Sequence, residues 1–189
     1  MFDVSSLDGR LCQLFIYARG YLPRDVLYHA WRAMEEDEAA ARVFHAYQVE
    51  SGEPFGLRGD LAYFVDYFAP PHGRQLLICQ AKVDDSIAGF IWFDDVIPQY
   101  RAMANLFFRR KFFGSVAFEA GNMALTFAFE AMSLKTLWAL TPWREANAYA
   151  KRIGFQPVAV LPQFTLIDQK PTDMHLLRLT VEDYLNGRG

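Results

Sequence analysis

The chain has 189 residues, of which 52% are hydrophobic, and this is enough apolar material to bury the core of one domain. Its formal net charge of -3 provides no overall positive field, which argues against general binding to nucleic acid. Because it lacks both a basic, apolar leader and an apolar run long enough to cross a bilayer, we expect a cytoplasmic protein with no membrane partner.

The N-terminal third of the chain is predicted to hold one short strand followed by helices. The apolar run 10–17 indicates a strand, although a helix stays open because periodicity cannot decide so short a run. From Arg24 to about Glu50, apolar residues recur at helical spacing, and the acidic run 35–38 marks a solvated face or a break between two helices. Asp60 can cap the next helix.

Two strands and a tight turn come next. Residues 74–82 and 86–96 are apolar and β-branched, and the aspartates and serine between them favour a turn, so a β-hairpin is predicted. Gly89 lies inside the second of these strands. A glycine at such a place indicates a bulge or a close approach of another backbone.

The segment 102–155 reads as strand, basic turn, helix, buried strand and a second helix that ends in Gly-Phe. After it we expect strands over 157–161 and 174–179, with a loop that contains Pro162 and Pro171, and a fraying end. This order predicts an α/β (α+β) fold with a mixed, mostly antiparallel central sheet and helices on both faces.

The basic turn is the strongest candidate binding feature. Arg109, Arg110 and Lys111 follow a strand, and Gly114 precedes a helix whose first amides have no carbonyl partner. Amides and cations at such a turn, here residues 109–115, form a site for phosphate groups, which we call the phosphate cradle. The alternative is a charged turn that is simply solvated.

Four stretches, taken with this order of elements, resemble the GNAT superfamily of acyl-CoA-dependent N-acetyltransferases. IAGFIWF with its glycine is similar to the family's third strand, and RRKFFGS is similar to its pyrophosphate loop. ANAYAKRIGF is similar to a helix near the family's C-terminus, and GFQPVAVL followed by MHLLRLTVEDY is similar to its closing strand pair. The nearest likeness is to the branch that acetylates ribosomal-protein N-termini.

The resemblance covers residues 75–184 and implies a single domain over residues 1–189, with a variable N-terminal region, residues 1–74, and a core, residues 75–184. It also implies a sheet with a V-shaped splay. Acetyl-CoA is the implied co-substrate, and no metal is expected, because neither of the two cysteines lies at a spacing typical of zinc. The implied cofactor-binding residues are Leu106, Phe107, Phe108, Arg109, Arg110, Lys111, Phe112, Phe113, Gly114, Ser115, Trp143 and Lys151.

This sequence departs from the family pattern in its loop and in its last helix. The loop keeps one glycine where the family has two small residues. Either Phe112 occupies the first small position, which lets Arg109 fit the leading basic position, or Val116 occupies the second. Trp143 stands where the family often has Asn. Lys151 can reach a phosphate of CoA, or it can be one of the cations usual at a helix C-terminus.

The reaction also needs a proton acceptor and a proton donor. Asp94 and Asp95 end a strand near the expected splay, and adjacent strand residues point to opposite faces, so at most one of them faces the cleft. The alternative for both is a polar strand end. The Tyr that serves as general acid in many members of the family falls on Ala150 here. Tyr149, one residue away, is therefore the candidate proton donor. Glu119 is interpreted as structural.

We therefore expect an N-acetyltransferase that uses acetyl-CoA and a primary amine carried by a protein N-terminus, an aminoacyl-tRNA or a small molecule. One alternative is a GNAT-fold binding module that has lost catalysis. Another is a nucleotide or nucleic-acid binder of a different fold. Phe112 and Phe113 can line a slot for the acyl group or for pantetheine, or they can dock a second subunit, which leaves a homodimer open.

Overall fold

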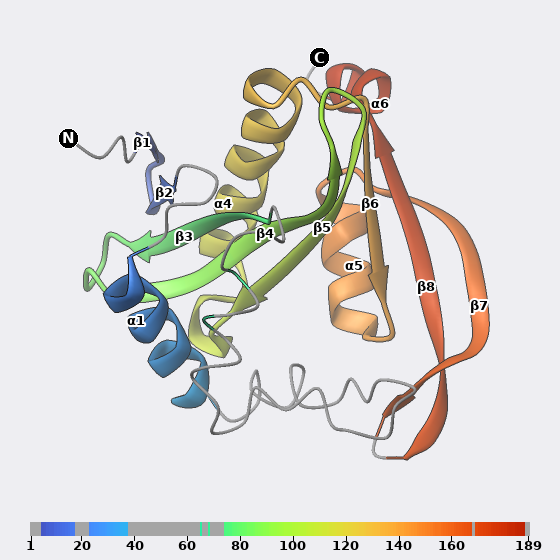
Figure 1. The fold of residues 1–189 in the computed structure, drawn as a ribbon, viewed down its shortest axis with the longest axis horizontal. Coiled ribbons are helices and arrows are strands. Elements are labelled where there is room, and N and C mark those ends of the chain that lie inside the picture. Colours follow the sequence, from blue (N-terminus) through green and yellow to red (C-terminus); the bar gives the residue numbers. More distant parts are fainter. Residues whose placement is uncertain are drawn as a thin grey trace.

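A computed structural model describes residues 5–17, 23–37, 65, 68, 74–167 and 169–187 of the chain. Within them, eight strands form one sheet in the order β1-β2-β3-β4-β5-β6-β8-β7 (Figure 1). The strands are β1 Ser5–Asp8, β2 Cys12–Ile16, β3 Gln75–Ala81, β4 Ile87–Ile97, β5 Arg101–Phe108, β6 Thr136–Thr141, β7 Gln156–Ile167 and β8 Lys170–Thr180. The helices are α1 Arg24–Glu35, the 3₁₀ turn η1 Arg110–Phe112, α4 Ser115–Thr126, the π-helical η2 Phe127–Ala131, α5 Arg144–Arg152 and α6 Val181–Asn186.

The sheet parts between β5 and β6. These two strands are parallel and pair only over Arg101–Met103, opposite Thr136–Trp138, whereas β5 pairs antiparallel with β4 as far as Phe108. Every other neighbouring pair in the described sheet is antiparallel. The result is a V whose closed end lies at Arg101 and whose open end lies beyond Phe108. The predicted mixed, mostly antiparallel sheet with a splay is confirmed.

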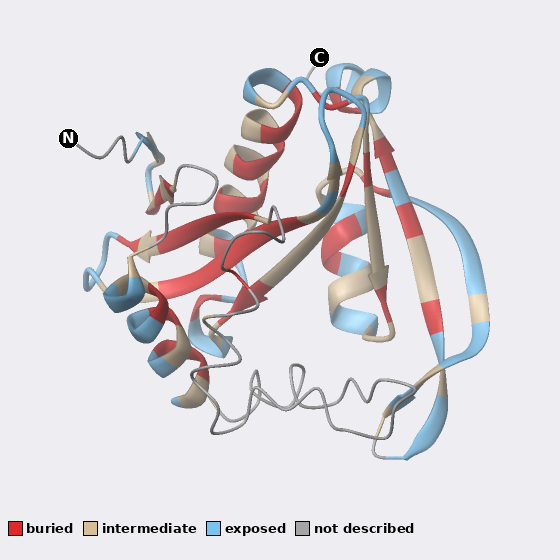
Figure 2. Ribbon diagram, viewed as in Figure 1, coloured by how far each residue is buried: buried red, intermediate tan, exposed pale blue. Residues whose placement is uncertain are grey.

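Alternation along β4 divides the hydrophobic interior into two layers. Phe90 and Trp92 point toward α1, where they pack with Leu27, while Phe93 points to the other face and packs with Ala120 of α4. This follows from the two-residue period of a strand. In Figure 2 the central strands and the inner side of α4 are accordingly buried. Helices therefore cover both faces of the sheet, as predicted.

The N-terminal hairpin is attached to α4 through one carboxylate. The strand β1 was not predicted, because its residues Ser-Ser-Leu-Asp are mostly polar. The side chain of Glu119 accepts hydrogen bonds from the backbone N–H groups of Arg10, Leu11 and Cys12, at 2.9, 2.6 and 3.0 Å. The structural interpretation of Glu119 agrees with these contacts, which satisfy amides in the turn between β1 and β2.

The C-terminal region is more regular than the sequence indicated. The prediction of a loop around Pro162 and Pro171 is wrong. These residues lie in a hairpin, since β7 and β8 pair as far as Ile167 and Lys170. Pro162 is tolerated because β7 is an edge strand, and the ladder shifts register between Leu161 and Thr165.

The expected fraying end is a short helix. The Thr180 hydroxyl caps α6 by accepting a hydrogen bond from the Asp183 N–H at 3.1 Å. At the other end of the chain, α1 stops at Glu35, and the predicted continuation to Glu50, like the cap at Asp60, lies outside the described residues. Among the described helices, none combines the length and apolarity needed to cross a bilayer.

Candidate functional site

The open end of the V brings two helix beginnings to one edge of the sheet. Because β5 and β6 are parallel, their carboxyl ends point the same way, and α4 and α5 follow them there. Beyond Met103, no strand in the described region of the sheet pairs with the side of β5 that faces β6. The backbone of residues 104–108 is thus available on that side for an extended ligand, which could pair as a further strand would.

The basic turn uses most of its own amides. The N–H of Arg109 donates to the Ala88 carbonyl at 2.9 Å, and the N–H of Arg110 donates to the carboxylate of Asp37. The remaining contacts form the 3₁₀ turn: Phe112 N–H to Arg109 O, Phe113 N–H to Arg110 O and Gly114 N–H to Phe112 O. The prediction of free amides is wrong for residues 109, 110 and 112–114, because these five N–H groups are already satisfied inside the protein.

The two phenylalanines of the turn have separate environments. Phe112 is only 6% exposed and belongs to the core under α4, so its ring does not line an open slot. Phe113 is 39% exposed, and its ring centroid lies 5.7 Å from that of Tyr149. Upstream, Phe107 and Phe108 are buried on opposite faces of β5, while Leu106 is half-buried. The side chains of these strand residues therefore belong to the core, and their backbone is what a ligand could reach.

The open donors lie at the first turn of α4. The N–H groups of Ser115, Val116 and Ala117 have no partner among the described residues, and the N-cap Gly114 provides no side chain. Gly114 has an extended backbone (φ -179°), and a Cβ placed there would meet nothing within 4 Å. Free amides beside open space at the positive end of a twelve-residue helix form a place for an anion.

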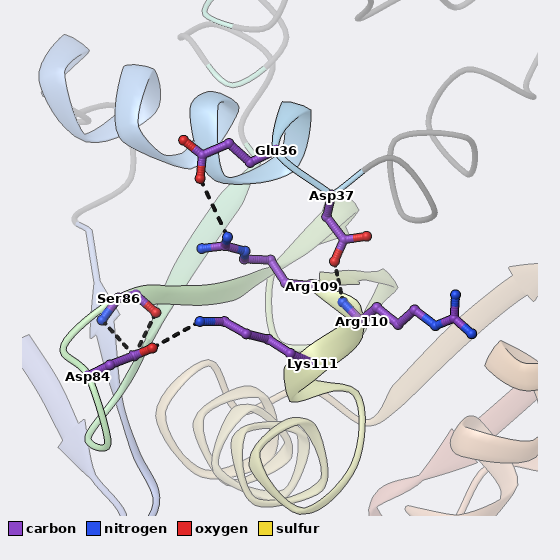
Figure 3. Close-up of polar contacts among 7 residues, drawn as sticks. All are labelled: Glu36, Asp37, Asp84, Ser86, Arg109, Arg110 and Lys111. Atoms are coloured by element: carbon purple, nitrogen blue, oxygen red, sulfur yellow. Dashed lines mark hydrogen bonds and ion pairs between the residues drawn. The ribbon is translucent and has the colours of Figure 1, made fainter.

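Carboxylates from two other elements face the cations of the turn (Figure 3). The Nη2 of Arg109 lies 3.4 Å from Oε2 of Glu36, and the Nζ of Lys111 lies 2.9 Å from Oδ2 of Asp84. Hydrogen bonds from Ser86, followed by Lys111, lower the pKa of Asp84 to about 2, so this carboxylate stays charged. The guanidinium of Arg110 is exposed and points away from these groups in the same view.

The beginning of α5 carries two buried polar atoms that have no hydrogen-bond partner among the described residues. They are Nε1 of Trp143, a donor, and Oδ1 of Asn147, an acceptor. The two residues are four apart in sequence, so they lie on one face of the helix. Trp143 was predicted, whereas Asn147 was missed. The signal that could have found it is its spacing of one helical turn from Trp143.

Tyr149 joins the two sides of the V. Its hydroxyl donates a 2.7 Å hydrogen bond to the carbonyl of Ala117, and burial raises the pKa of Tyr149 above its ordinary value. Gly121 makes this possible, because a Cβ there would lie 2.1 Å from the Tyr149 oxygen. The Tyr149 hydroxyl is buried, and its proton is already donated to a backbone carbonyl of α4. This environment favours a structural contact between α5 and α4 over the predicted role as proton donor.

The two candidate carboxylates on β4 differ sharply. Asp94 is half-buried and accepts from Arg74 Nε at 2.6 Å, from Trp92 Nε1 at 3.0 Å and from Asn105 Nδ2 of β5 at 3.0 Å. Asp95 is exposed, with φ 46°, where the register with β5 shifts. The structure therefore brings Asp94, but not Asp95, into contact with the strand that borders the V.

Lys151 and the partners of Asp94 are the remaining residues to place. Lys151 is exposed on the last turn of α5. The contacts of Asp94 add Arg74 and Asn105, which the sequence reasoning missed. Nothing in the sequence marks them, since one lies before an apolar strand and the other lies within one.

Comparison with known proteins defines the class of fold. No protein family model matches the sequence, and no curated protein matches it. Solved structures do match. A mutant of the spermidine N-acetyltransferase SpeG from Vibrio cholerae has a TM-score of 0.73 at 14% identity, over 96% of this chain and 100% of that chain.

Two other solved structures are similar over nearly the whole chain. A probable GNAT-family acetyltransferase from Chromobacterium violaceum has a TM-score of 0.72 at 18% identity, over 96% of this chain and 89% of that one. A GNAT-family acetyltransferase from Bacillus anthracis has a TM-score of 0.69 at 15% identity, over 94% and 99%. The chain has the fold of these GNAT acetyltransferases, as the resemblance predicted. The particular likeness to the ribosomal-protein branch stays a prediction.

Proposed function

We propose that this protein transfers an acetyl group from acetyl-CoA to a primary amine. The observation that carries the proposal is the open end of the V. There the free amides of residues 115–117 and the unpaired polar atoms of Trp143 and Asn147 stand at the beginnings of two helices. The GNAT acetyltransferase fold of the solved structures named above supports the same reaction class.

The chain's own groups fit the successive segments of the co-substrate. The first-turn amides of α4, with the exposed guanidinium of Arg110, would hold the diphosphate. The unpaired side of β5 at residues 106–108 would pair with the pantetheine arm. A pantetheine amide offers one C=O and one N–H, which complement the donor of Trp143 and the acceptor of Asn147.

When bound, acetyl-CoA supplies a thioester whose acyl group an amine nitrogen can take, with release of the free thiol. An amide on the open side of β5 would donate to the carbonyl oxygen as negative charge develops on it. Asp94 would accept the proton that the amine loses, because it is the β4 carboxylate in contact with β5. Arg74 and Trp92 hold that carboxylate in one orientation.

A second candidate is a GNAT-fold module that binds acyl-CoA without catalysis. The satisfied amides of the basic turn and the buried hydroxyl of Tyr149 favour it, because they remove groups that the resemblance assigned to the active site. Both candidates need the same ligand.

Calorimetric titration with acetyl-CoA, followed by an assay of free thiol with a panel of amines, tests the proposal. The panel comprises a polyamine, peptides with free N-termini and an aminoacyl-tRNA. Saturable binding with thiol release supports the enzyme, and binding without turnover of any amine supports the module. If the folded protein does not bind acetyl-CoA, both candidates are wrong.

Gly114 provides the sharpest variant for the binding step. A Leu side chain there would fill the open space in front of the α4 amides, so Gly114→Leu should weaken binding of acetyl-CoA by about tenfold or more. The free energy of unfolding should change by less than about 0.5 kcal/mol, since a Cβ at this position meets nothing within 4 Å. Gly114→Ala is the matched control, with a smaller loss. Equal losses of binding and of stability in Gly114→Leu would make Gly114 only a structural turn.

A further inference from the structure

The end of α1 contacts the basic turn across a long sequence separation. Asp37 accepts from the backbone N–H of Arg110, and Glu36 lies on the guanidinium of Arg109; both pairs are 73 residues apart (Figure 3). These are two of the donors that the sequence assigns to the phosphate cradle. A carboxylate oxygen on a backbone amide and on a guanidinium makes the same charge-assisted contacts as a phosphate oxygen.

The position of these carboxylates is unfavourable for the helix that carries them. Glu36 is the C-cap of α1 and Asp37 follows it, at the end where the helix dipole is negative and cations are preferred. Both acids face the cationic turn, so the contact with the turn offsets the repulsion at the helix end. The contact is therefore one that an anion binding to the turn would compete with directly.

On the opposite side of the turn, Asp84 makes a different contact. Its carboxylate reaches only the side chain of Lys111 in that turn, and it is itself held by the hydroxyl and the N–H of Ser86, at 2.6 and 3.1 Å. It occupies no backbone donor of the turn. Asp84 and Asp37 thus carry the same charge near the same turn, but only Asp37 covers an amide.

We propose that Asp37, assisted by Glu36, is a specificity-determining residue that competes intramolecularly with phosphate groups for the turn at Arg109 and Arg110. This proposal rests on the proposed function, since it assumes that acyl-CoA binds at the open end of the V with its diphosphate on the α4 amides. It adds that a phosphate oxygen then takes the Arg110 amide from Asp37. A small phosphate compound lacks further contacts and cannot displace the carboxylate. CoA can displace it, because its pantetheine arm gains the edge of β5 and the groups on α5.

Two substitutions that remove the same charge separate this competition from general electrostatics. Asp37→Ala should tighten binding of CoA by about three- to tenfold, while Asp84→Ala should change it by less than about twofold. Inorganic pyrophosphate, which should bind the wild type too weakly to detect, should bind Asp37→Ala measurably. The measurement is calorimetric titration at one ionic strength, with urea unfolding to verify that each variant is folded.

The resonance of the Arg110 amide reports directly on its hydrogen bond to Asp37. In the ¹⁵N–¹H spectrum, Asp37→Ala should shift the Arg110 amide, and saturation of the wild type with CoA should shift the same amide, because both remove the carboxylate from it. Asp84→Ala should leave that resonance in place.

Three outcomes overturn the proposal. If Asp37→Ala binds CoA more weakly than wild type or equally well, Asp37 does not compete with phosphate and only positions the turn. Equal tightening by Asp37→Ala and Asp84→Ala makes the effect one of net charge. In both cases the wild type still binds CoA, so the proposed function survives. If no variant binds CoA, this proposal and the proposed function are wrong together.

Discussion

The two sides of the V are built differently. On one side, β3, β4 and β5 lie between α1 and α4, and nearly every residue of β3 and the first half of β4 is buried. On the other side, β6, β8 and β7 end in an edge strand that is exposed along most of its length (Figure 2). Apolar burial is the main favourable term in folding, so the first side supplies most of the stability.

The polar groups divide in the same way. On the first side, the carboxylates of Glu119 and Asp94 each accept several hydrogen bonds from the protein. On the second side, Trp143 and Asn147 each bury a polar atom that has no partner in the part of the chain that the structure describes. A buried polar atom without a partner costs free energy that a ligand can recover. The comparison teaches that the carboxylates at the packed side are satisfied by the protein, whereas the beginning of α5 keeps polar atoms that the proposed function assigns to the ligand.

The largest effect should come from breaking the first side at Gly89. A Cβ there would lie 2.2 Å from the Phe107 carbonyl oxygen and 2.8 Å from the Phe108 Cα, and backbone atoms cannot yield as a side chain can. Gly89→Val should therefore lower the free energy of unfolding by more than about 3 kcal/mol, or prevent folding. Urea unfolding measures it. A loss below about 1 kcal/mol would mean that β4 and β5 can separate at little cost.

Next comes the junction of the N-terminal hairpin with α4. Burial acts to raise the pKa of Glu119, but hydrogen bonds from three amides and the Cys12 thiol outweigh it, so the pKa lies below its ordinary value. A lowered folded-state pKa stabilises the protein above the unfolded-state pKa, and this stability is lost as the pH falls through the folded-state pKa.

Glu119→Gln should accordingly lose about 1–2 kcal/mol of unfolding free energy at pH 7. The difference from wild type should shrink as the pH falls below about 4.3, the usual pKa of Glu. Urea unfolding across this range measures both curves. A difference that stays constant with pH would show that the charge of Glu119 plays no role.

Between the two sides, Tyr149 offers a smaller effect. Tyr149→Phe removes the hydrogen bond to the Ala117 carbonyl and keeps the ring, so it should lower the free energy of unfolding by about 1 kcal/mol. Because the hydroxyl is engaged with α4, the rate of thiol release at saturating substrates should change by less than about twofold. A fall of about 100-fold or more would restore Tyr149 as the proton donor.

The smallest effect is expected on the second side, at Trp143. Trp143→Phe removes an unpaired donor and most of the ring stays, so the free energy of unfolding should change by less than about 0.5 kcal/mol. Binding of acetyl-CoA should weaken by about three- to fivefold, measured by calorimetry. Trp138→Phe on β6, whose ring lies 6.0 Å from the Arg178 guanidinium, is the matched control and should leave binding unchanged. Equal binding by wild type and Trp143→Phe would contradict the pantetheine contact.

Much of the fold could be predicted because its signals are local. Short apolar runs marked β3, β4 and β5, and turn-forming residues marked the hairpin at Asp84. The strand β1 was missed because its residues are mostly polar. The two outer ends of the hairpin β7–β8 were predicted as strands, but its distal part around Pro162 and Pro171 was read as a loop because of the prolines. Pro162 is compatible with a strand only at an edge, and whether a strand lies at an edge depends on its neighbours.

The sequence by itself determined the order of strands and helices from β3 to α5 and the presence of a cationic turn before α4, because these depend on residues close together along the chain. Tertiary structure alone decided which groups of that turn are free. The ring of Phe112 is buried because it packs in the core under α4. The Arg110 amide is occupied because it donates to Asp37, a residue 73 positions earlier in the chain. Hydrogen bonds and packing between distant segments leave no local pattern, so only the folded chain assigns them.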